Sequence, residues 1–290
     1  MIEQVLCEHL KSQVDLAECL TTYSGMPAVF NQSAPDDKDE LWAKGPQYGR
    51  IVFAVDLQGD PERIMGGLLA VDIMCKDAED SEDPVPEDVE PILRNLIHGF
   101  FFSKDTFVVS AQWRSSDYFT QPADQVIGCT VTFDLLAFPI ITTSAPDIVA
   151  RFNEWSSHVD NLHVINYDAL PEAAWKPSGN ESAVYWRFVT EAPANWIPDT
   201  YQTIWRTATI KGHIFSETPA IATSVARDLT VRLYAAKRLL KDGEAPIMVN
   251  RRNTTDYGAD PLRTGQVTVE ATFGIIVTRG SGDTIQNINY

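Results

Sequence analysis

The most constraining feature of this 290-residue chain is that one order of sequence patterns occurs twice. Each half opens with apolar residues at helical spacing, beginning at Ile2 and at Ile148. A strand rich in β-branched and aromatic residues follows in each half, over 50–56 and over 184–189. Because the same succession of elements is repeated, we expect two similar domains in tandem rather than one large domain.

The two patterns stay in step through the middle of each half. A second strand is predicted over 67–75 and over 204–215, and apolar and polar residues alternate in the latter. A longer helix then begins at a proline in each copy. It is predicted over 86–97 in the first copy, and in the second from Pro219, after the capping residue Thr218, as far as a basic C-terminal end. The basic residues of that end are Lys237, Arg238 and Lys241.

Each half is predicted to close with two strands joined by a long connection. A similar short sequence precedes the last strand in both copies, Arg114–Tyr118 in the first and Asn253–Tyr257 in the second. The Asp-Tyr pair that ends this sequence has two interpretations. It forms a turn with a packed tyrosine, or it belongs to a protruding hairpin arm that reaches an adjacent subunit, since long connections are often functional.

The repeated unit therefore has the predicted order α-β-β-α-β-β. Such a unit forms a small, mostly antiparallel sheet packed by two helices, so the expected fold class is α+β with two similar tandem domains. The predicted domains are residues 1–141 and residues 142–277, and residues 278–290 form a polar C-terminal tail. One face or edge of each sheet is expected to stay available to neighbouring molecules.

Charge distinguishes the two halves. The chain carries 23 Lys and Arg against 40 Asp and Glu, a net charge of −17. Residues 1–145 hold 9 basic and 24 acidic residues, whereas residues 146–290 hold 14 and 16. This acidic excess repels phosphate backbones, which argues against generic nucleic-acid binding. Much of it lies in a run interpreted as a solvated loop, with the carboxylates Asp77, Glu79, Asp80, Glu82 and Asp83.

The sequence contains no local motif for catalysis, metal binding or membrane insertion. The histidines and cysteines lack metal-ligand spacing, the acidic run lacks the calcium-loop pattern, and no phosphate-binding glycine motif or nucleophile elbow occurs. The uncharged stretch 135–146 is too short to cross a bilayer. We therefore expect no enzyme activity, no cofactor, no metal and no membrane contact, and we interpret the four cysteines as reduced core thiols.

Two tryptophans lie in proline-rich segments, where several roles are open to them. Trp175 lies within 171–177, and Trp196 lies within 193–198. Each of them either packs in the core, anchors a loop or fills a pocket of a partner, because indole rings serve all of these roles.

The layout of residues 1–140 resembles the tail terminator, or tail completion, proteins of long-tailed bacteriophages. The resemblance rests on an N-terminal helix with Asp15-Leu-Ala17, a loop that ends Pro46-Gln-Tyr48, the strand Ile51–Val55, a central helix and a last hairpin that ends Thr130–Asp134. The second half looks like a diverged copy of the same domain. Members of this family are usually single domains that form a six-membered ring at the head-proximal end of the tail tube, where the ring stops tube growth and faces the head connector.

The resemblance implies a structural protein of the virion tail that is assembled in the host cytoplasm. Its implied partners are the tail tube protein, head-tail connector proteins and further copies of itself, with DNA only passing through the lumen. Two lobes per chain let a homotrimer supply six lobes, and a homohexamer with the second lobe as an outer decoration is the alternative. An acidic ring suits a channel that DNA crosses without adhering.

The family offers no catalytic residues, so we expect only interface residues from it. The interface candidates are Arg114, Asp117, Tyr118, Arg251, Arg252, Asp256 and Tyr257, and the acidic run 77–83 is the candidate lumen surface or loop. Two alternatives stay open. The first is another head-tail connector, tail tube or baseplate component, since related folds serve several positions. The second is a small-molecule-binding protein or hydrolase without a local motif, which would have a deep pocket with converging polar groups.

Overall fold

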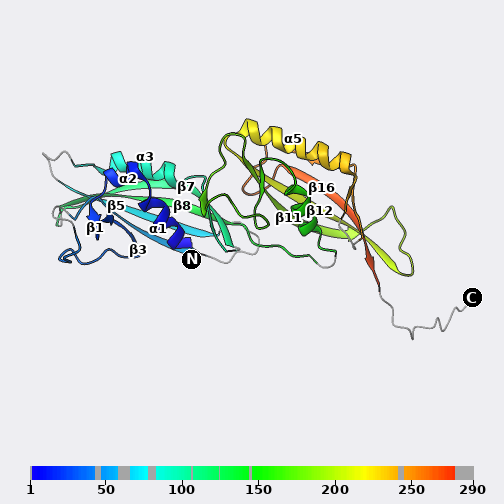
Figure 1. Ribbon diagram of the computed structural model, residues 1–290, viewed down its shortest axis with the longest axis horizontal. Helices are drawn as coiled ribbons and strands as arrows, with labels where there is room; N and C mark the ends of the chain where they lie inside the picture. Colours follow the sequence, from blue (N-terminus) through cyan, green and yellow to red (C-terminus); the bar gives the residue numbers. More distant parts are fainter. Residues whose placement is uncertain are drawn as a thin grey trace, which may run out of the picture. The chain divides into compact units, whose positions relative to one another are not determined.

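The computed structural model describes residues 2–42, 47–57, 66–77, 83–105, 107–123, 125–143, 146–240 and 245–277. The chain forms two compact units, which are considered separately (Figure 1). Unit 1 comprises Met1–Ile140 together with Ala169–Lys176, and unit 2 comprises Ile141–Asp168 together with Pro177–Tyr290. The first division lies beside the predicted boundary at residue 141. The short segment 169–176 belongs to unit 1, although it follows that boundary in the sequence.

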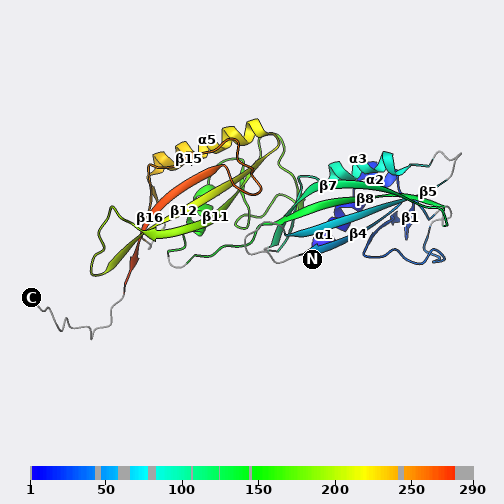
Figure 2. The ribbon, with the colours of Figure 1, turned by 180° about the vertical axis from the view of Figure 1, so that it is seen from behind.

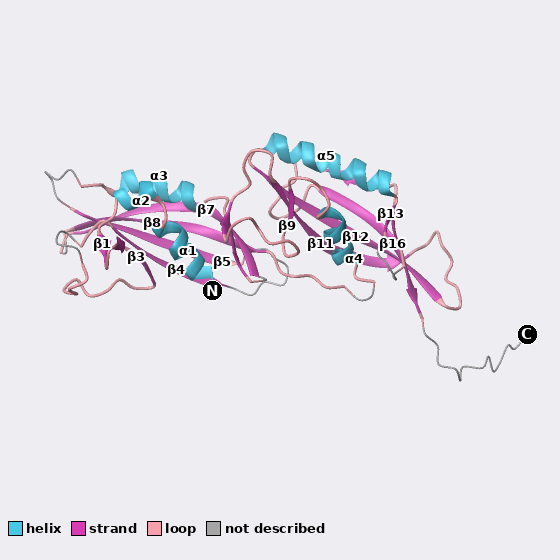
Figure 3. Cartoon of the chain, viewed as in Figure 1, coloured by secondary structure: helices cyan, strands magenta, loops and turns pink. Residues whose placement is uncertain are grey.

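Unit 1 is one mostly antiparallel sheet with helices packed on it (Figure 3). Its helices are α1 (Ile2–Lys11), α2 (Val14–Glu18) and α3 (Pro86–Ile97). Its strands are β1 (Thr22–Tyr23), β2 (Met26–Pro27), β3 (Val29–Asn31), β4 (Arg50–Leu57), β5 (Gly67–Lys76), β6 (Phe101–Lys104), β7 (Phe107–Gln121), β8 (Val126–Ala137) and β10 (Ala174–Trp175). Within the described residues, the main sheet has the order β10-β6-β7-β8-β5-β4-β3, and β1 and β2 form a separate hairpin.

Alternation along the strands of unit 1 places one face of the sheet in the core. In β5, Leu69, Val71 and Ile73 are buried, and the residues between them lie on the opposite face. Helices α1 and α3 pack on the buried side, for example through Leu6 and Leu93. Burying each such side chain stabilises the fold by roughly 1.5–3 kcal/mol. Figure 2 shows the strands from the side away from α1, which is the helix-free face of the sheet.

Unit 2 has the same kind of layers. Its helices are α4 (Ile148–Ser156) and α5 (Pro219–Ala236). Its strands are β9 (Leu162–Val164), β11 (Ser182–Pro193), β12 (Thr203–Ser216), β13 (Arg238–Leu239), β14 (Ile247–Val249), β15 (Thr254–Thr255) and β16 (Val267–Ile276). Within the described residues the sheet has the order β13-β14-β16-β12-β11-β9, and β15 also pairs with β16. In the core, the buried Trp186 donates a hydrogen bond from Nε1 to Ser156 Oγ over 2.8 Å.

The two sheets have corresponding strand orders. When β4 is aligned with β11 and β5 with β12, the strands β3, β8, β7 and β6 correspond in position to β9, β16, β14 and β13. In both units the short edge strand, β3 or β9, is parallel to its neighbour. The fold is therefore α+β and mostly sheet. The predicted order α-β-β-α-β-β omits this edge strand and the short strand after the second helix, because segments of two to four residues are too short to show a period.

The second long helix begins where the sequence predicted and ends earlier. Thr218 is its N-cap and accepts a hydrogen bond at Oγ1 from the Ile221 N–H over 3.3 Å, which confirms the predicted start. The predicted basic C-terminal turn is wrong. Lys237 ends the helix in a left-handed conformation with φ 59°, and Arg238 lies in β13. Lys241 lies outside the described residues.

A strand from residues 169–176 completes one edge of unit 1. Trp175 of β10 pairs with Phe101 of β6, and its ring centroid lies 6.1 Å from that of Phe101. Phe101 in turn lies 5.5 Å from Phe138, and the Trp175 side chain is 6% exposed. Lys176 Nζ donates to the His98 carbonyl oxygen over 3.0 Å. Of the interpretations that the sequence left open for Trp175, the structure supports a buried position, in an aromatic cluster with Phe101 and Phe138 that is separate from the helix-covered core of unit 1.

Candidate interaction surfaces

A groove of about 1070 Å³ lies on the helix-free face of the unit 2 sheet. Its floor is set by alternation along β12. Thr207 and Thr209 line the groove, whereas Ala208 and Ile210 between them are buried in the core. Glu270 of β16 lies beside Thr209 in register. The lining therefore combines hydroxyl groups with apolar residues such as Met248 and Val249, and the groove is open to solvent.

Four cationic side chains border this groove. Lys237 and Arg238 come from the end of α5 and from β13, and Arg251 and Arg252 follow β14. All four residues are exposed, and none forms an ion pair with a described residue. Among the described lining residues, Glu270 is the single acid. We call this site the basic groove, since it is a local region of positive potential on a chain with a net charge of −17.

Two exposed aromatic residues also line the basic groove. Trp196 comes from the connection between β11 and β12 and is 60% exposed, and Tyr234 near the end of α5 is 50% exposed. The core interpretation is therefore wrong for Trp196. Tryptophan, tyrosine and arginine are the residues most enriched at the energetic centres of protein interfaces. Arg251 and Arg252 are among the interface residues expected from the sequence. Lys237 and Arg238 are not, because the sequence pattern indicates a helix end there.

Carboxylates gather at one end of unit 1, where α2 packs beside the first turn of α3. Asp15 and Glu18 are exposed on α2, Glu87 and Asp88 are exposed on α3, and Asp77 is exposed just after β5. We call these five residues the acidic end. The Asp88 side chain also accepts a hydrogen bond at Oδ2 from the Val85 N–H over 3.3 Å, which caps α3.

Two thiols beside the acidic end are affected by its charge. Burial raises the pKa of Cys75 to about 12, and the charges of Glu87 and Asp88 add to this effect. Burial also raises the pKa of Cys19, with contributions from carboxylates on both α2 and α3. Carboxylates of α2 and α3 therefore lie close enough together to act on the same two thiols.

The predicted acidic run lies partly within the described residues. Asp77 is exposed at the end of β5, and Asp83 is exposed shortly before α3. Glu79, Asp80 and Glu82 lie outside the described residues. The two described members of the run therefore lie beside the acidic end or within it.

The first Asp-Tyr pair lies inside a strand rather than in a long connection. Asp117 and Tyr118 are part of β7, where they pair with Thr130 and Cys129 of β8. The prediction of a long connection is therefore wrong for unit 1, because β7 runs on to Gln121 and a short turn leads into β8. Tyr118 is 53% exposed.

Arg114 lies at an irregularity of the same strand. The register between β7 and β8 shifts between Trp113 and Ser115, so Arg114 is left without a partner residue in the ladder. Its Nη1 lies 3.4 Å from Asp134 Oδ1 of β8. Arg114 therefore offsets the charge of one carboxylate on the helix-free face.

The second Asp-Tyr pair does lie in a connection. Asp256 and Tyr257 begin the segment that leads from β15 into β16, and Tyr257 is 53% exposed. Near the end of this segment, the buried Gln266 side chain exchanges hydrogen bonds of 2.9 and 2.7 Å with the backbone of Ile214 in β12. The connection is therefore anchored to its own sheet.

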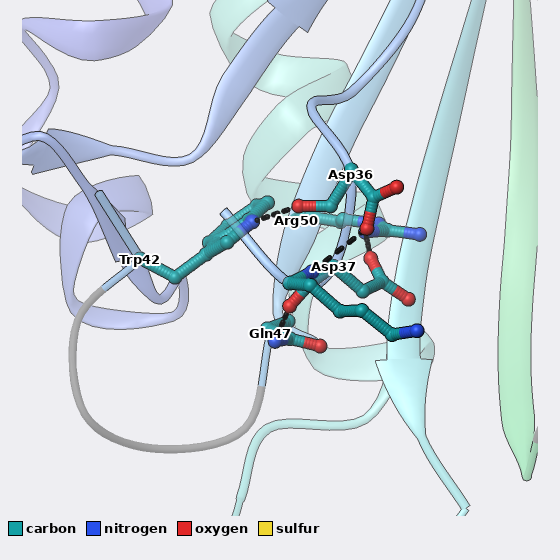
Figure 4. Close-up of polar contacts among 6 residues, drawn as sticks. Asp36, Asp37, Trp42, Gln47 and Arg50 are labelled. Atoms are coloured by element: carbon teal, nitrogen blue, oxygen red, sulfur yellow. Dashed lines mark hydrogen bonds and ion pairs between the residues drawn. The ribbon is translucent and has the colours of Figure 1, made fainter. Parts of the chain in front are cut away.

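A third polar cluster fixes the loop after β3 (Figure 4). Arg50 Nη1 lies 2.6 Å from Asp37 Oδ1, and Gln47 Nε2 donates to the Asp37 carbonyl oxygen. Trp42 Nε1 donates to the Asp36 carbonyl oxygen over 3.0 Å, and the Arg50 guanidinium lies 6.0 Å from the Trp42 ring centroid. These contacts tie the loop to β4, so the cluster has a structural role.

Within the parts of the chain that the structure describes, no group of His, Cys, Asp or Glu side chains is placed to hold a metal ion. The helices of those parts are all too short or too polar to span a membrane. Comparison with protein-family models, with curated proteins and with solved structures gives no match.

Proposed function

We propose that the protein is a structural component of a long-tailed bacteriophage virion and forms a ring at the head-proximal end of the tail tube. In this role it ends tube growth and provides the surface on which the head docks. The observation that carries the proposal is the pair of sheets with corresponding strand orders. Each sheet has helices packed on one face.

Tandem duplication of one ring-forming domain accounts for the corresponding sheets. Six strands correspond in spatial order, including the parallel strand at one edge, and a helix precedes this edge strand in each unit. Three copies of such a chain supply six lobes around the tube, which makes a homotrimer the favoured assembly. A homohexamer with outer second lobes is the alternative.

The helix-free face of unit 1 suits a channel for DNA. In one row across the sheet, Asp72 and Asp117 both pair with Thr130. In another row, Leu68 pairs with Asp56 and with Asp134. Carboxylates on this face repel phosphate groups, so DNA would pass without adhering.

The open shape of the basic groove supports docking of a partner rather than catalysis. Its charged side chains border an open floor, whereas an enzyme site encloses its ligand and directs a few polar groups at it. This favours a structural protein over the hydrolase alternative.

Electron microscopy of the purified protein, with and without tail tubes, tests the proposed function. We expect closed rings with a central opening, and we expect such a ring at one end of each tube. We also expect tubes polymerised with the protein present to be shorter than tubes polymerised without it. Absence of rings, or tubes of unchanged length with no density at either end, would reject the proposal.

A further inference from the structure

The basic groove has the composition of a docking site for an acidic protein surface. Its four cations have no ion-pair partner among the described residues, and they border the exposed rings of Trp196 and Tyr234. Arginine and aromatic side chains dominate binding energy at protein interfaces, and a partner would supply the missing counter-charges. The four cations of the groove therefore lack counter-charges among the described residues.

The chain itself carries a surface of the complementary kind. The acidic end presents Asp15, Glu18, Asp77, Glu87 and Asp88, all exposed, on unit 1. Its charges come from two helices and a strand end. Positive and negative patches on different units of one chain favour contact between copies.

We propose that the basic groove of unit 2 binds the acidic end of unit 1 of a second copy of this chain. The contact is heterologous, because the two patches differ, and repeated contacts of this kind close into a ring when the rotation permits. The inference rests on the proposed ring only for its closure. It adds which surfaces meet between copies and in which direction the copies follow one another.

Nucleic acid is the competing occupant of a basic groove. Residues 1–145 carry 24 acidic against 9 basic residues, and this field opposes the approach of any polyanion to the same molecule. A second copy presents only its acidic end to the groove, and it carries a groove of its own for the next copy. The charge distribution therefore favours self-association.

Charge reversal on the full-length protein tests the proposal. In the groove variant, Lys237→Glu, Arg238→Glu, Arg251→Glu and Arg252→Glu are combined. In the acidic-end variant, Asp15→Lys, Glu18→Lys, Asp77→Lys and Glu87→Lys are combined, and Asp88 is left in place because it caps α3. Sedimentation velocity should show each variant alone dissociating at concentrations about tenfold or more above those at which the wild type dissociates. Assembly of the wild type should weaken as NaCl is raised from about 0.05 M to about 0.5 M.

Mixing the two variants restores complementary pairs. The reversed groove of one variant faces the reversed acidic end of the other, while both unchanged patches also match. We expect the mixture to assemble, as an alternating series that closes only with an even number of copies. A single chain with all eight substitutions should assemble at about the wild-type concentration, with no such restriction.

A matched control separates the local effect of the groove charges from the effects of net charge and of fold. Arg227→Glu with Arg263→Glu makes the net charge more negative through exposed positions that do not line the groove, and it should assemble like the wild type. Hydrogen exchange of every variant should match the wild type in the cores of both units, so that loss of assembly is not loss of fold.

Three results would overturn the inference. Wild type that forms rings while both variants also form rings would place the contact elsewhere and leave the proposed function intact. An eight-substitution chain that stays dissociated would do the same. A labelled DNA oligonucleotide that binds the wild type but not the groove variant, with assembly unchanged, would make nucleic acid the occupant. Rings that depend on both patches but do not cap tail tubes would refute only the proposed function.

Discussion

Replacing Trp175 by alanine should destabilise unit 1, although this residue follows the first 29 residues of the second half of the sequence. Its ring packs on Phe101, and its side chain is 6% exposed. A buried aromatic side chain covers roughly 150–250 Å², which at about 25 cal/mol per Å² corresponds to roughly 4–6 kcal/mol. Measured Trp→Ala costs in cores run at about 3–5 kcal/mol. We therefore expect Trp175→Ala to lower the free energy of unfolding of unit 1 by about 3–5 kcal/mol.

Hydrogen exchange with mass spectrometry separates the two units in this test. Peptides from β6 and β7 should exchange faster in Trp175→Ala, whereas peptides from β12 and β16 should keep their wild-type protection. The first thermal transition should move down by roughly 10 °C, at about 2–4 °C per kcal/mol. Trp196→Ala is the matched control, because that side chain is 60% exposed and its loss should change stability by no more than about 0.5 kcal/mol. Unchanged exchange in unit 1, or equal effects in both units, would refute the assignment of β10 to unit 1.

Three further predictions concern local structure. Thr218→Ala removes the N-cap of α5 and should cost about 1 kcal/mol by urea denaturation, whereas Thr218→Ser should cost little. Gly128→Ala places a methyl group 2.7 Å from the Ile73 carbonyl oxygen and should cost about 1–3 kcal/mol; an unchanged midpoint would contradict this packing. The pKa of Cys75 is raised to about 12 and that of Cys129 to about 11, so both thiols stay protonated in the fold while they ionise in the unfolded chain. The free energy of unfolding should therefore be unaffected by the two thiols below about pH 8.5. Above that pH it should fall by up to about 1.4 kcal/mol per pH unit for each thiol, as the pH rises towards these pKa values. The fall should be smaller in Cys75→Ala.

Sequence patterns predicted the main elements of the fold because those elements are long. The strand that begins at Arg50 and the helix over 86–97 have clear periods and clear end signals, and the structure has both. Short strands such as β3 and β9 show no period and were missed. The transfer of residues 169–176 to unit 1 is a tertiary effect, since nothing in a two-residue strand indicates which sheet it joins.

The interaction surfaces were predicted only in part, for a similar reason. Arg251 and Arg252 are expected at an interface because they lie near a connection in the sequence, and they line the basic groove. Lys237 lines it too, but its left-handed backbone, which turns the chain out of the helix, has no sequence signal because a glycine usually fills that role. Tyr118 was expected in a loop, but it lies in β7, because this strand continues past it to Gln121.

The central claim is that copies of this chain close into a ring with six lobes. The most direct test is the absolute mass of the purified protein over a range of concentrations, by light scattering after size exclusion, with images of the same fractions. The account predicts a discrete species of three times the 32.3 kDa chain mass, or six times in the alternative, with a central opening. A protein that stays at the mass of one chain at every concentration and forms no ring on tail tubes would contradict it.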